Sequence, residues 1–69
     1  MTFGEALRIA MDERGITAKD ICDKSGITAP YISKLLNGKF TDPTWQKACL
    51  IFDALDMSAD EFRKIVKSE

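Results

Sequence analysis

The chain of 69 residues contains no histidine and has neither a Gly-rich phosphate loop nor a nucleophile motif. Histidine is the commonest general base in enzymes, so its absence removes the most frequent catalytic group. Acidic residues are plentiful, but they are spread along helical patterns with no pocket that would raise their pKa values. We therefore expect no enzymatic activity, no cofactor and no small-molecule ligand.

Cysteine is also scarce, since Cys22 and Cys49 are the only two in the chain. They have no CxxC spacing, and a structural zinc site needs four ligands of suitable type, so we expect no metal. We interpret both as small buried side chains in a reducing cytosol.

Long apolar runs are missing as well. No stretch approaches the ~20 residues that cross a membrane, and the N-terminus lacks the basic and apolar blocks of a signal peptide. We expect a cytoplasmic protein without membrane contact.

The chain has the composition of a globular protein, with 45% apolar and 30% charged residues. Its length suits one domain over residues 1–69. The net charge of −1 and the pI of 5.3 supply no global electrostatic argument for nucleic acid. The lysines are nevertheless clustered. Between Lys24 and Lys47 there are four lysines and a single acid, Asp42, which predicts a modest basic face on an acidic protein.

Helix signals occupy the first half of the chain. Thr2-Phe3-Gly4-Glu5 is a capping-box pattern, and the apolar spacing after it predicts a helix over about residues 3–14, ended by Gly15. Thr17 caps a second helix that Gly26 ends after two turns.

Thr28 caps a third helix, which Asn37-Gly38 closes. The second and third helices are too short to be stable alone, so packing must hold them. The residues expected to do so are apolar: Ile16, Ile21, Ile27, Ile32 and Leu35.

The second half predicts two further helices. Asp42-Pro43 reads as the cap and first residue of the fourth. Ser58-Ala59-Asp60-Glu61, preceded by Met57, is a capping box with an apolar staple, and it opens the fifth, with Phe62, Ile65 and Val66 facing inward. The apolar set of the fourth helix is broad enough to suggest a central, mostly buried position: Trp45, Ala48, Cys49, Leu50, Ile51, Phe52 and Leu55. With no strand pattern, we predict an all-α fold of five short helices around one core.

The second and third helices, joined by Ser25-Gly26-Ile27, resemble a helix-turn-helix with a glycine in its turn. The order and spacing of the motifs over about residues 4–66 are similar to the phage-repressor and Cro-like (XRE-type) helix-turn-helix family. The matching segments are Arg14-Gly15-Ile16-Thr17, Asp20-Ile21-Cys22, Ser25-Gly26-Ile27, Tyr31-Ile32-Ser33-Lys34-Leu35, Asn37-Gly38-Lys39, Asp42-Pro43-Thr44 and Ala54-Leu55-Asp56-Met57-Ser58.

The resemblance implies a lambda-repressor-like domain of a prokaryotic or phage transcriptional regulator. Such a domain binds double-stranded operator DNA as a homodimer on half-sites about one helical turn (~34 Å) apart. The chain departs from the family at Ala18, where members often carry a glutamine that grips a phosphate. It also departs at Leu36, where a glutamate is usual, and the connector before Pro43 is about one residue longer.

In a helix-turn-helix the second helix lies in the major groove. Lys34 is the best candidate for a base edge, because lysine donates to guanine O6 and N7. Ser33 reaches a base or a phosphate, or is simply exposed. Tyr31 either contacts the DNA backbone or packs against the first half of the motif.

At the start of that helix, Pro30 has no N–H, so we expect the Thr28 hydroxyl to cap the N–H of Tyr31 and to contact phosphate second. Ala29 and Pro30 offer only apolar contact, for example with a thymine methyl, or allow close approach to the groove. The phosphate candidates are Thr17, Lys19, Asn37 and Lys39, with backbone N–H groups at the starts of the second and third helices.

Two alternatives stay open. Phe40, Leu36 and the Phe62–Val66 face are candidates for dimer contacts, or they belong to the core. The acidic pI, Ala18 and the apolar Ala29-Pro30 tip favour a different class of function, a helix-turn-helix-fold interaction module such as an antirepressor or adaptor that does not bind DNA.

Overall fold

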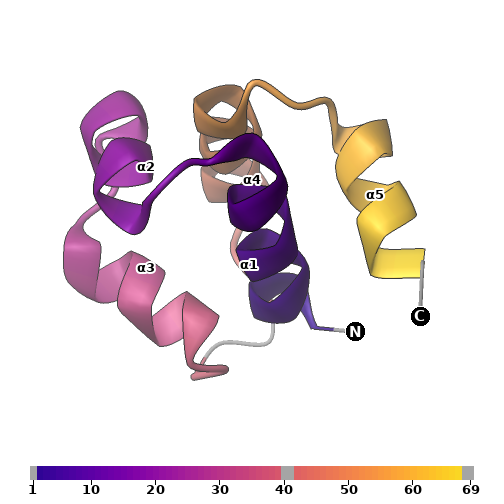
Figure 1. Cartoon of the computed structure of the whole chain (residues 1–69). Helices are drawn as coiled ribbons and strands as arrows, with labels where there is room; N and C mark the ends of the chain where they lie inside the picture. Colours follow the sequence, from indigo (N-terminus) through magenta and orange to yellow (C-terminus); the bar gives the residue numbers. More distant parts are fainter. Residues whose placement is uncertain (1, 40–41, 68–69) are drawn as a thin grey trace.

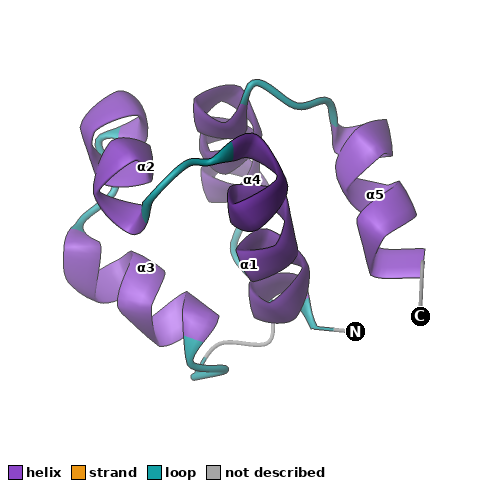
Figure 2. Ribbon diagram, viewed as in Figure 1, coloured by secondary structure: helices purple, strands orange, loops and turns teal. Residues whose placement is uncertain are grey.

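The computed structural model describes residues 2–39 and 42–67, and these residues form five α-helices and no strand (Figure 2). The helices are α1 (Phe3–Arg14), α2 (Ala18–Ser25), α3 (Ala29–Leu36), α4 (Trp45–Leu55) and α5 (Ala59–Lys67). The predicted all-α fold of five helices is therefore confirmed. Within the described ranges no helix has the length and apolar character needed to cross a membrane.

The helix ends follow the local capping signals closely. α1 covers the predicted range, with the Thr2 hydroxyl accepting the Glu5 N–H at 3.1 Å and Gly15 ending the helix at φ +65°. The Glu5 carboxylate accepts from the Thr2 hydroxyl instead of the Thr2 backbone, so only half of the expected box forms there. At α5 the box is complete, because the Ser58 and Glu61 side chains each accept the other's backbone N–H, at 3.1 and 3.3 Å.

The predicted start of α4 was wrong. Thr44, not Asp42, is the N-cap, and its hydroxyl accepts the N–H of Lys47 at 3.4 Å, so the helix begins at Trp45. Pro43 stands before the cap instead of at the first helical position. The Thr44 hydroxyl reaches the backbone N–H three residues later, which has no partner inside the helix. If Asp42 were the cap, Thr44 would itself lie inside the helix and could not cap it.

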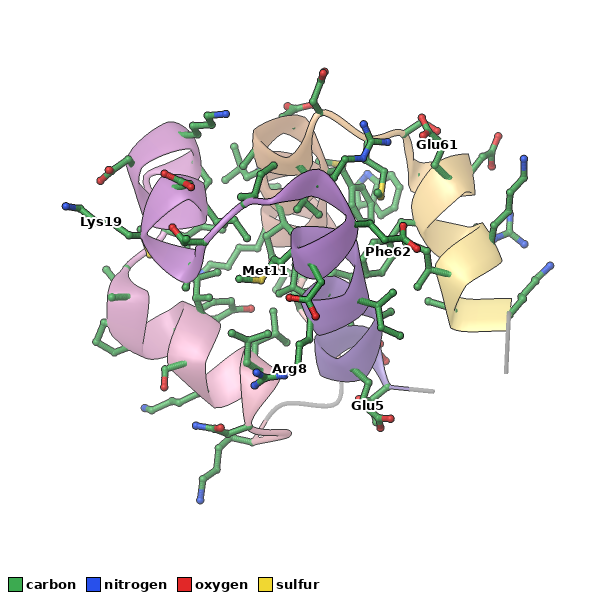
Figure 3. All side chains as sticks on the ribbon, viewed as in Figure 1. Glu5, Arg8, Met11, Lys19, Glu61 and Phe62 are labelled. Atoms are coloured by element: carbon green, nitrogen blue, oxygen red, sulfur yellow. The ribbon has the colours of Figure 1, made fainter. Side chains whose placement is uncertain are left out.

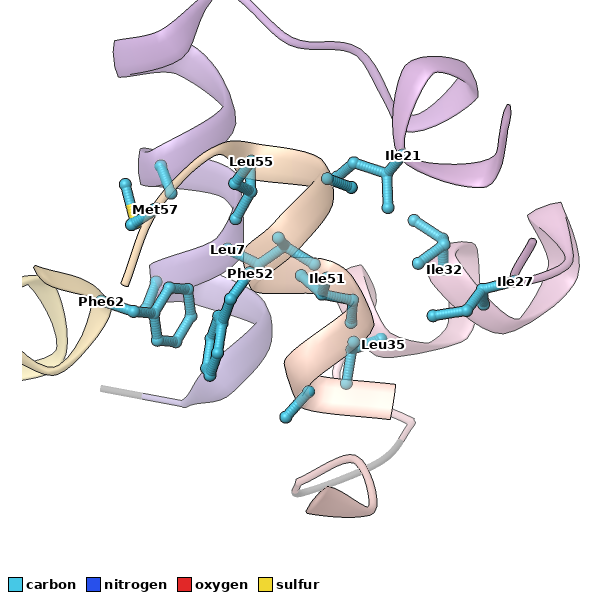
Figure 4. Packing of buried hydrophobic residues seen from close by; sticks show 14 residues of the cluster. Leu7, Ile21, Ile27, Ile32, Leu35, Ile51, Phe52, Leu55, Met57 and Phe62 are labelled. Carbon is cyan, nitrogen blue, oxygen red and sulfur yellow. The ribbon is translucent and has the colours of Figure 1, made fainter. Parts of the chain in front are cut away.

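The helices surround one apolar core. In Figure 1, α2 and α3 lie on one side of α1 and α4, and α5 lies on the other, with α4 in contact with α1, α2 and α5. The fully buried large side chains come from α1 to α4 and meet in the middle of the molecule (Figure 4). They are Leu7, Ile21, Ile32, Leu35, Ile51 and Leu55.

An aromatic cluster attaches α5 to the rest of the core. The ring of Phe3 lies 4.7 Å from that of Phe62 and 6.1 Å from that of Phe52, and the last two are 5.0 Å apart, all between centroids. These tilted contacts are in the range that aromatic pairs favour. Phe62 of the predicted inner face is buried, and Ile65 and Val66 are half-buried against the core, so α5 docks on the face expected for it.

α4 is less buried than its apolar set suggested. Trp45 is 71% exposed and Leu50 41% exposed, while Ala48, Ile51, Phe52, Ala54 and Leu55 are buried. The neighbouring helices leave one side of α4 open, and Trp45, as its first residue, projects beyond them. Cys22 and Cys49 are free and only half-buried, so the expectation that both are buried was wrong.

Candidate nucleic-acid interface

The turn between α2 and α3 is held by the side chain of Ser25. Its hydroxyl donates to the carbonyl of Ile21 at 2.5 Å and accepts the N–H of Ile27 at 3.1 Å. Gly26 adopts φ +77°, a conformation that costs glycine little, and its N–H donates to Cys22 at 2.9 Å. These bonds set the angle between the two helices of the motif, and Ser25 is a residue whose role the sequence pattern did not single out.

α3 separates cleanly into an inner and an outer side. Ile32 and Leu35 are fully buried. Pro30, Ser33 and Lys34 are exposed, as are Thr28, Ala29 and Asn37. Because residues at i, i+3, i+4 and i+7 share one helix face, Pro30, Ser33, Lys34 and Asn37 form a single outward stripe. The structure thus brings most of the groove candidates onto one accessible surface, which we call the reading face after the role expected for these residues.

The Thr28 hydroxyl does not cap α3, and this expectation was wrong. Thr28 is the N-cap with φ −72° and ψ 149°, but its side chain forms no capping hydrogen bond. The N–H of Tyr31 donates instead to the Thr28 backbone carbonyl at 3.1 Å, and Ile32 donates to the same oxygen at 3.3 Å. Since that carbonyl satisfies the donor that the hydroxyl would have capped, the exposed hydroxyl is left for another acceptor or donor.

Tyr31 packs inward and has a charged neighbour from α4. It is half-buried against the core, and the Lys47 ammonium lies over its ring, 4.0 Å from the centroid. A cation at this distance from an aromatic face is attracted to it, typically by ~0.5–1 kcal/mol at an exposed site. The sequence pattern did not place Lys47 beside α3, because nothing local to either residue predicts that α4 brings the two together.

The N-terminus of α2 is organised by a capping box. The Thr17 hydroxyl accepts the Asp20 N–H at 3.2 Å, and the Asp20 carboxylate accepts the Thr17 N–H at 3.0 Å. The hydrogen bond from the Thr17 backbone is the main cause that lowers the pKa of Asp20. The donors without an acceptor in the helix are then the N–H groups of Ala18 and Lys19. Figure 3 shows the Lys19 side chain extending outward from α2.

The C-terminal end of α3 is closed by a turn with a left-handed glycine. Gly38, at φ +77°, donates to the Leu35 carbonyl at 3.2 Å, and Lys39 donates to Lys34 at 2.8 Å. The Asn37 amide donates to the Ser33 hydroxyl at 3.4 Å. This bond orients Ser33 and places Asn37 and Lys39, both exposed, at the end of the reading face.

The residues considered for dimer contacts differ in how exposed their side chains are. Leu36 is half-buried and packs against the core, and Phe40 lies outside the described residues. The most exposed large apolar side chain in the described part of the chain is Trp45, which the sequence pattern had assigned to the interior. Among the described residues no group of three or more Cys, Asp or Glu side chains gathers into a possible metal site.

Comparison with known proteins agrees with this geometry. The model of the helix-turn-helix family matches residues 7–62. The chain is also similar to two proteins named trifunctional NAD biosynthesis/regulator protein NadR, from Salmonella typhimurium and Escherichia coli K12. Each is 38% identical over 47 residues, which cover 68% of this chain but only 12% of the relative.

No solved structure gives a significant match. The matched segment contains the whole of α2 and α3 with their Ser25-Gly26 turn, and it extends from α1 into α5. The chain therefore belongs to the XRE-type helix-turn-helix family of DNA-binding regulators and has its lambda-repressor-like fold.

Proposed function

We propose that this chain is a sequence-specific double-stranded DNA-binding domain of a transcriptional regulator, which reads an operator with α3 in the major groove. The observation that carries the proposal is the division of α3, whose inner residues are fully buried while Pro30, Ser33, Lys34 and Asn37 form one exposed stripe. A short helix held in this way presents its outer side chains to base edges. The word regulator in the names of its relatives supports the same class.

The exposed residues divide into two roles. Lys34 and Ser33 contact base edges, because both carry donors and stand in the middle of the stripe. Ala29 and Pro30 meet the groove as an apolar tip. The phosphate contacts come from Lys19 and the other residues that flank the stripe, since phosphate contacts position a protein on the duplex without reading sequence. These other residues are Thr17, Thr28 and Lys39, and Asn37, at the C-terminal end of the stripe, is a further phosphate contact.

Tyr31 contacts a backbone phosphate through its hydroxyl, with its ring held by Lys47 at 4.0 Å. Residues 1–69 act as one domain, and two copies bind a near-palindromic operator with half-sites about one helical turn (~34 Å) apart. The basic residues between Lys24 and Lys47 attract the duplex locally despite the net charge of −1.

Selection of bound sequences from a random duplex pool tests the proposal, because it reports binding and half-site spacing together. On the selected site, Lys34→Ala is expected to cost roughly 1–3 kcal/mol and to relax preference at one base position. Lys39→Ala is expected to weaken all sequences about equally and to reduce the salt dependence. Lys64→Ala, on α5 and away from the reading face, serves as the control and should leave affinity unchanged. Equal behaviour of the Lys34 and Lys39 variants would contradict the assigned roles.

Two features of the sequence favour a second function, a helix-turn-helix interaction module that does not bind DNA. Ala18 removes the side-chain donor that family members often place at the start of α2, and the pI is 5.3. The two functions differ in their response to salt, since DNA binding weakens steeply as salt rises. A random duplex that shows no binding at ~50 mM salt would favour the interaction module.

A further inference from the structure

An apolar hollow lies on the side of the molecule away from α2, at the start of α4. It has a volume of about 390 Å³, and its walls include Phe3, Pro43, Trp45 and Val66. We call it the Trp45 groove. Trp45 is 71% exposed, whereas the described residues include only two other large apolar side chains that are exposed, Leu50 at 41% and Ile9 at 36%. A tryptophan exposed to this degree beside an apolar hollow marks an interaction surface.

The groove also carries two opposite charges. Asp42 and Arg63 both line it and both are exposed. Within the part of the chain that the structure describes, neither forms an ion pair; the ion pair that is formed, at 2.8 Å, joins Arg14 to Glu61 at another place. A surface with one free acid and one free base can be complementary to itself, because a two-fold contact that places the acid of one copy against the base of the other also places the base of the first against the acid of the second.

We propose that the occupant of the Trp45 groove is a second copy of this chain. The two copies pack their Trp45 side chains together around a two-fold axis, and Asp42 of each copy pairs with Arg63 of the other. This inference rests on the proposed function for the two-fold symmetry of the operator. Of the candidates for dimer contacts that the sequence suggested, the groove includes Phe62 and Val66 of the Phe62–Val66 face but not Leu36, and Phe40 lies outside the described residues.

The placement of the helices is compatible with binding to DNA. In Figure 1, α3 and α5 lie on opposite sides of α1 and α4, so a copy docked between the start of α4 and α5 leaves both reading faces open. Each molecule measures 28 × 24 × 21 Å, so two copies side by side can hold their α3 helices about one helical turn (~34 Å) apart.

The size of the groove sets the strength of the contact. Trp45 offers on the order of 150 Å² of exposed surface, while a stable complex buries about 800 Å² on each partner. A contact centred on this groove is therefore weak in free solution, with a dissociation constant between about 10 μM and 1 mM. The pair forms fully when two adjacent half-sites hold the copies together, which makes operator binding cooperative.

Sedimentation of the chain without DNA, together with its fluorescence, tests the dimer directly. Trp45 is the only tryptophan, so its emission should shift to shorter wavelength as concentration rises and the indole becomes buried. Asp42→Arg and Arg63→Asp are each expected to weaken the dimer by about tenfold or more, and the double variant to restore it to within about threefold. Trp45→Ala should also weaken it while leaving the fold intact, because the side chain is mostly exposed.

The control is Lys64→Asp, which makes the same kind of charge change on α5 outside the groove and should have no effect on the dimer. A double charge-swap variant as weak as the single variants would overturn the proposal, as would a chain that stays monomeric at ~1 mM. Binding of each variant to a duplex with a single half-site separates this result from the proposed function. Variants that lose cooperativity on the full operator but bind a half-site normally support the dimer. Wild-type protein that dimerises without binding DNA would contradict the proposed function and leave the dimer standing.

Discussion

α1 comes close to the end of α3 at Gly4, and replacing this glycine tests the packing of the motif. Gly4 is buried, and a Cβ built on it would overlap the backbone carbonyl oxygen of Leu35, with the Leu36 Cα also within van der Waals contact at 3.4 Å. A backbone oxygen cannot rotate away as a side chain can. Gly4→Ala therefore has to push α1 and α3 apart.

Two effects of this substitution oppose each other. Alanine inside a helix is favoured over glycine by up to ~1 kcal/mol, which would stabilise α1. Overpacking typically costs ~1–3 kcal/mol. The displaced Leu35 oxygen also accepts the Gly38 N–H at 3.2 Å, and losing that bond costs about a further 1 kcal/mol. The steric cost wins, and the expected net loss is about 1–3 kcal/mol.

A loss of this size is large for a domain whose whole stability is roughly 3–10 kcal/mol at this length. Thermal unfolding followed by circular dichroism should show the melting temperature falling by about 4–8 °C for each kcal/mol lost. Glu13→Ala is the matched control, since it places alanine at an exposed position of α1 and should change stability by less than ~0.5 kcal/mol. A Gly4→Ala variant as stable as the wild type, or more stable, would refute the close approach of α1 to α3.

Three further predictions concern the motif and its supports. Lys47→Gln should lower the free energy of unfolding by about 0.5–1 kcal/mol and weaken DNA binding, because it removes the cation over the Tyr31 ring. Lys47→Arg keeps a cation there and should retain both stability and binding. Equal losses in the two variants would contradict the contact. Ser25→Ala removes both side-chain hydrogen bonds of the turn and should cost about 1–3 kcal/mol in a urea titration, where an unchanged midpoint would speak against that role. The pKa values of Asp20 and Glu61 are both lowered, chiefly by hydrogen bonds from the backbone of their capping partners, so the ionised forms stabilise the fold. That stability is present above the ordinary carboxyl values of 3.8 and 4.5 and is lost as pH falls through the lower folded pKa values, so an Asp20→Asn, Glu61→Gln variant should show a flatter dependence of stability on pH in acid.

The sequence predicted most of the helix ends because capping is a contact between residues three apart. Thr17 and Ser58 cap through side-chain oxygens that reach N–H groups nearby, and Gly26 ends α2 in a left-handed conformation. The same local logic misplaced the start of α4, where two capping candidates, Asp42 and Thr44, stand close together and only the second forms the bond.

The candidate site was predicted less evenly. The exposed stripe of α3 followed from helical periodicity once Ile32 and Leu35 were assigned to the core. The Thr28 hydroxyl was expected to form a capping bond, but the Thr28 carbonyl accepts that proton instead. Either oxygen is within reach of the same N–H, so the pattern of residues alone does not choose between them.

By itself, the sequence determined the helical class, the family, the inner and outer sides of α3 and the local clustering of lysines, because periodicity and capping depend on near neighbours. Only the tertiary structure decided which distant residues meet. It placed Lys47 over Tyr31, passed α3 against Gly4 and left Trp45 on the surface. The reason is physical: an apolar side chain on a helix is buried only where another helix covers it, and that coverage follows from how all five helices pack together.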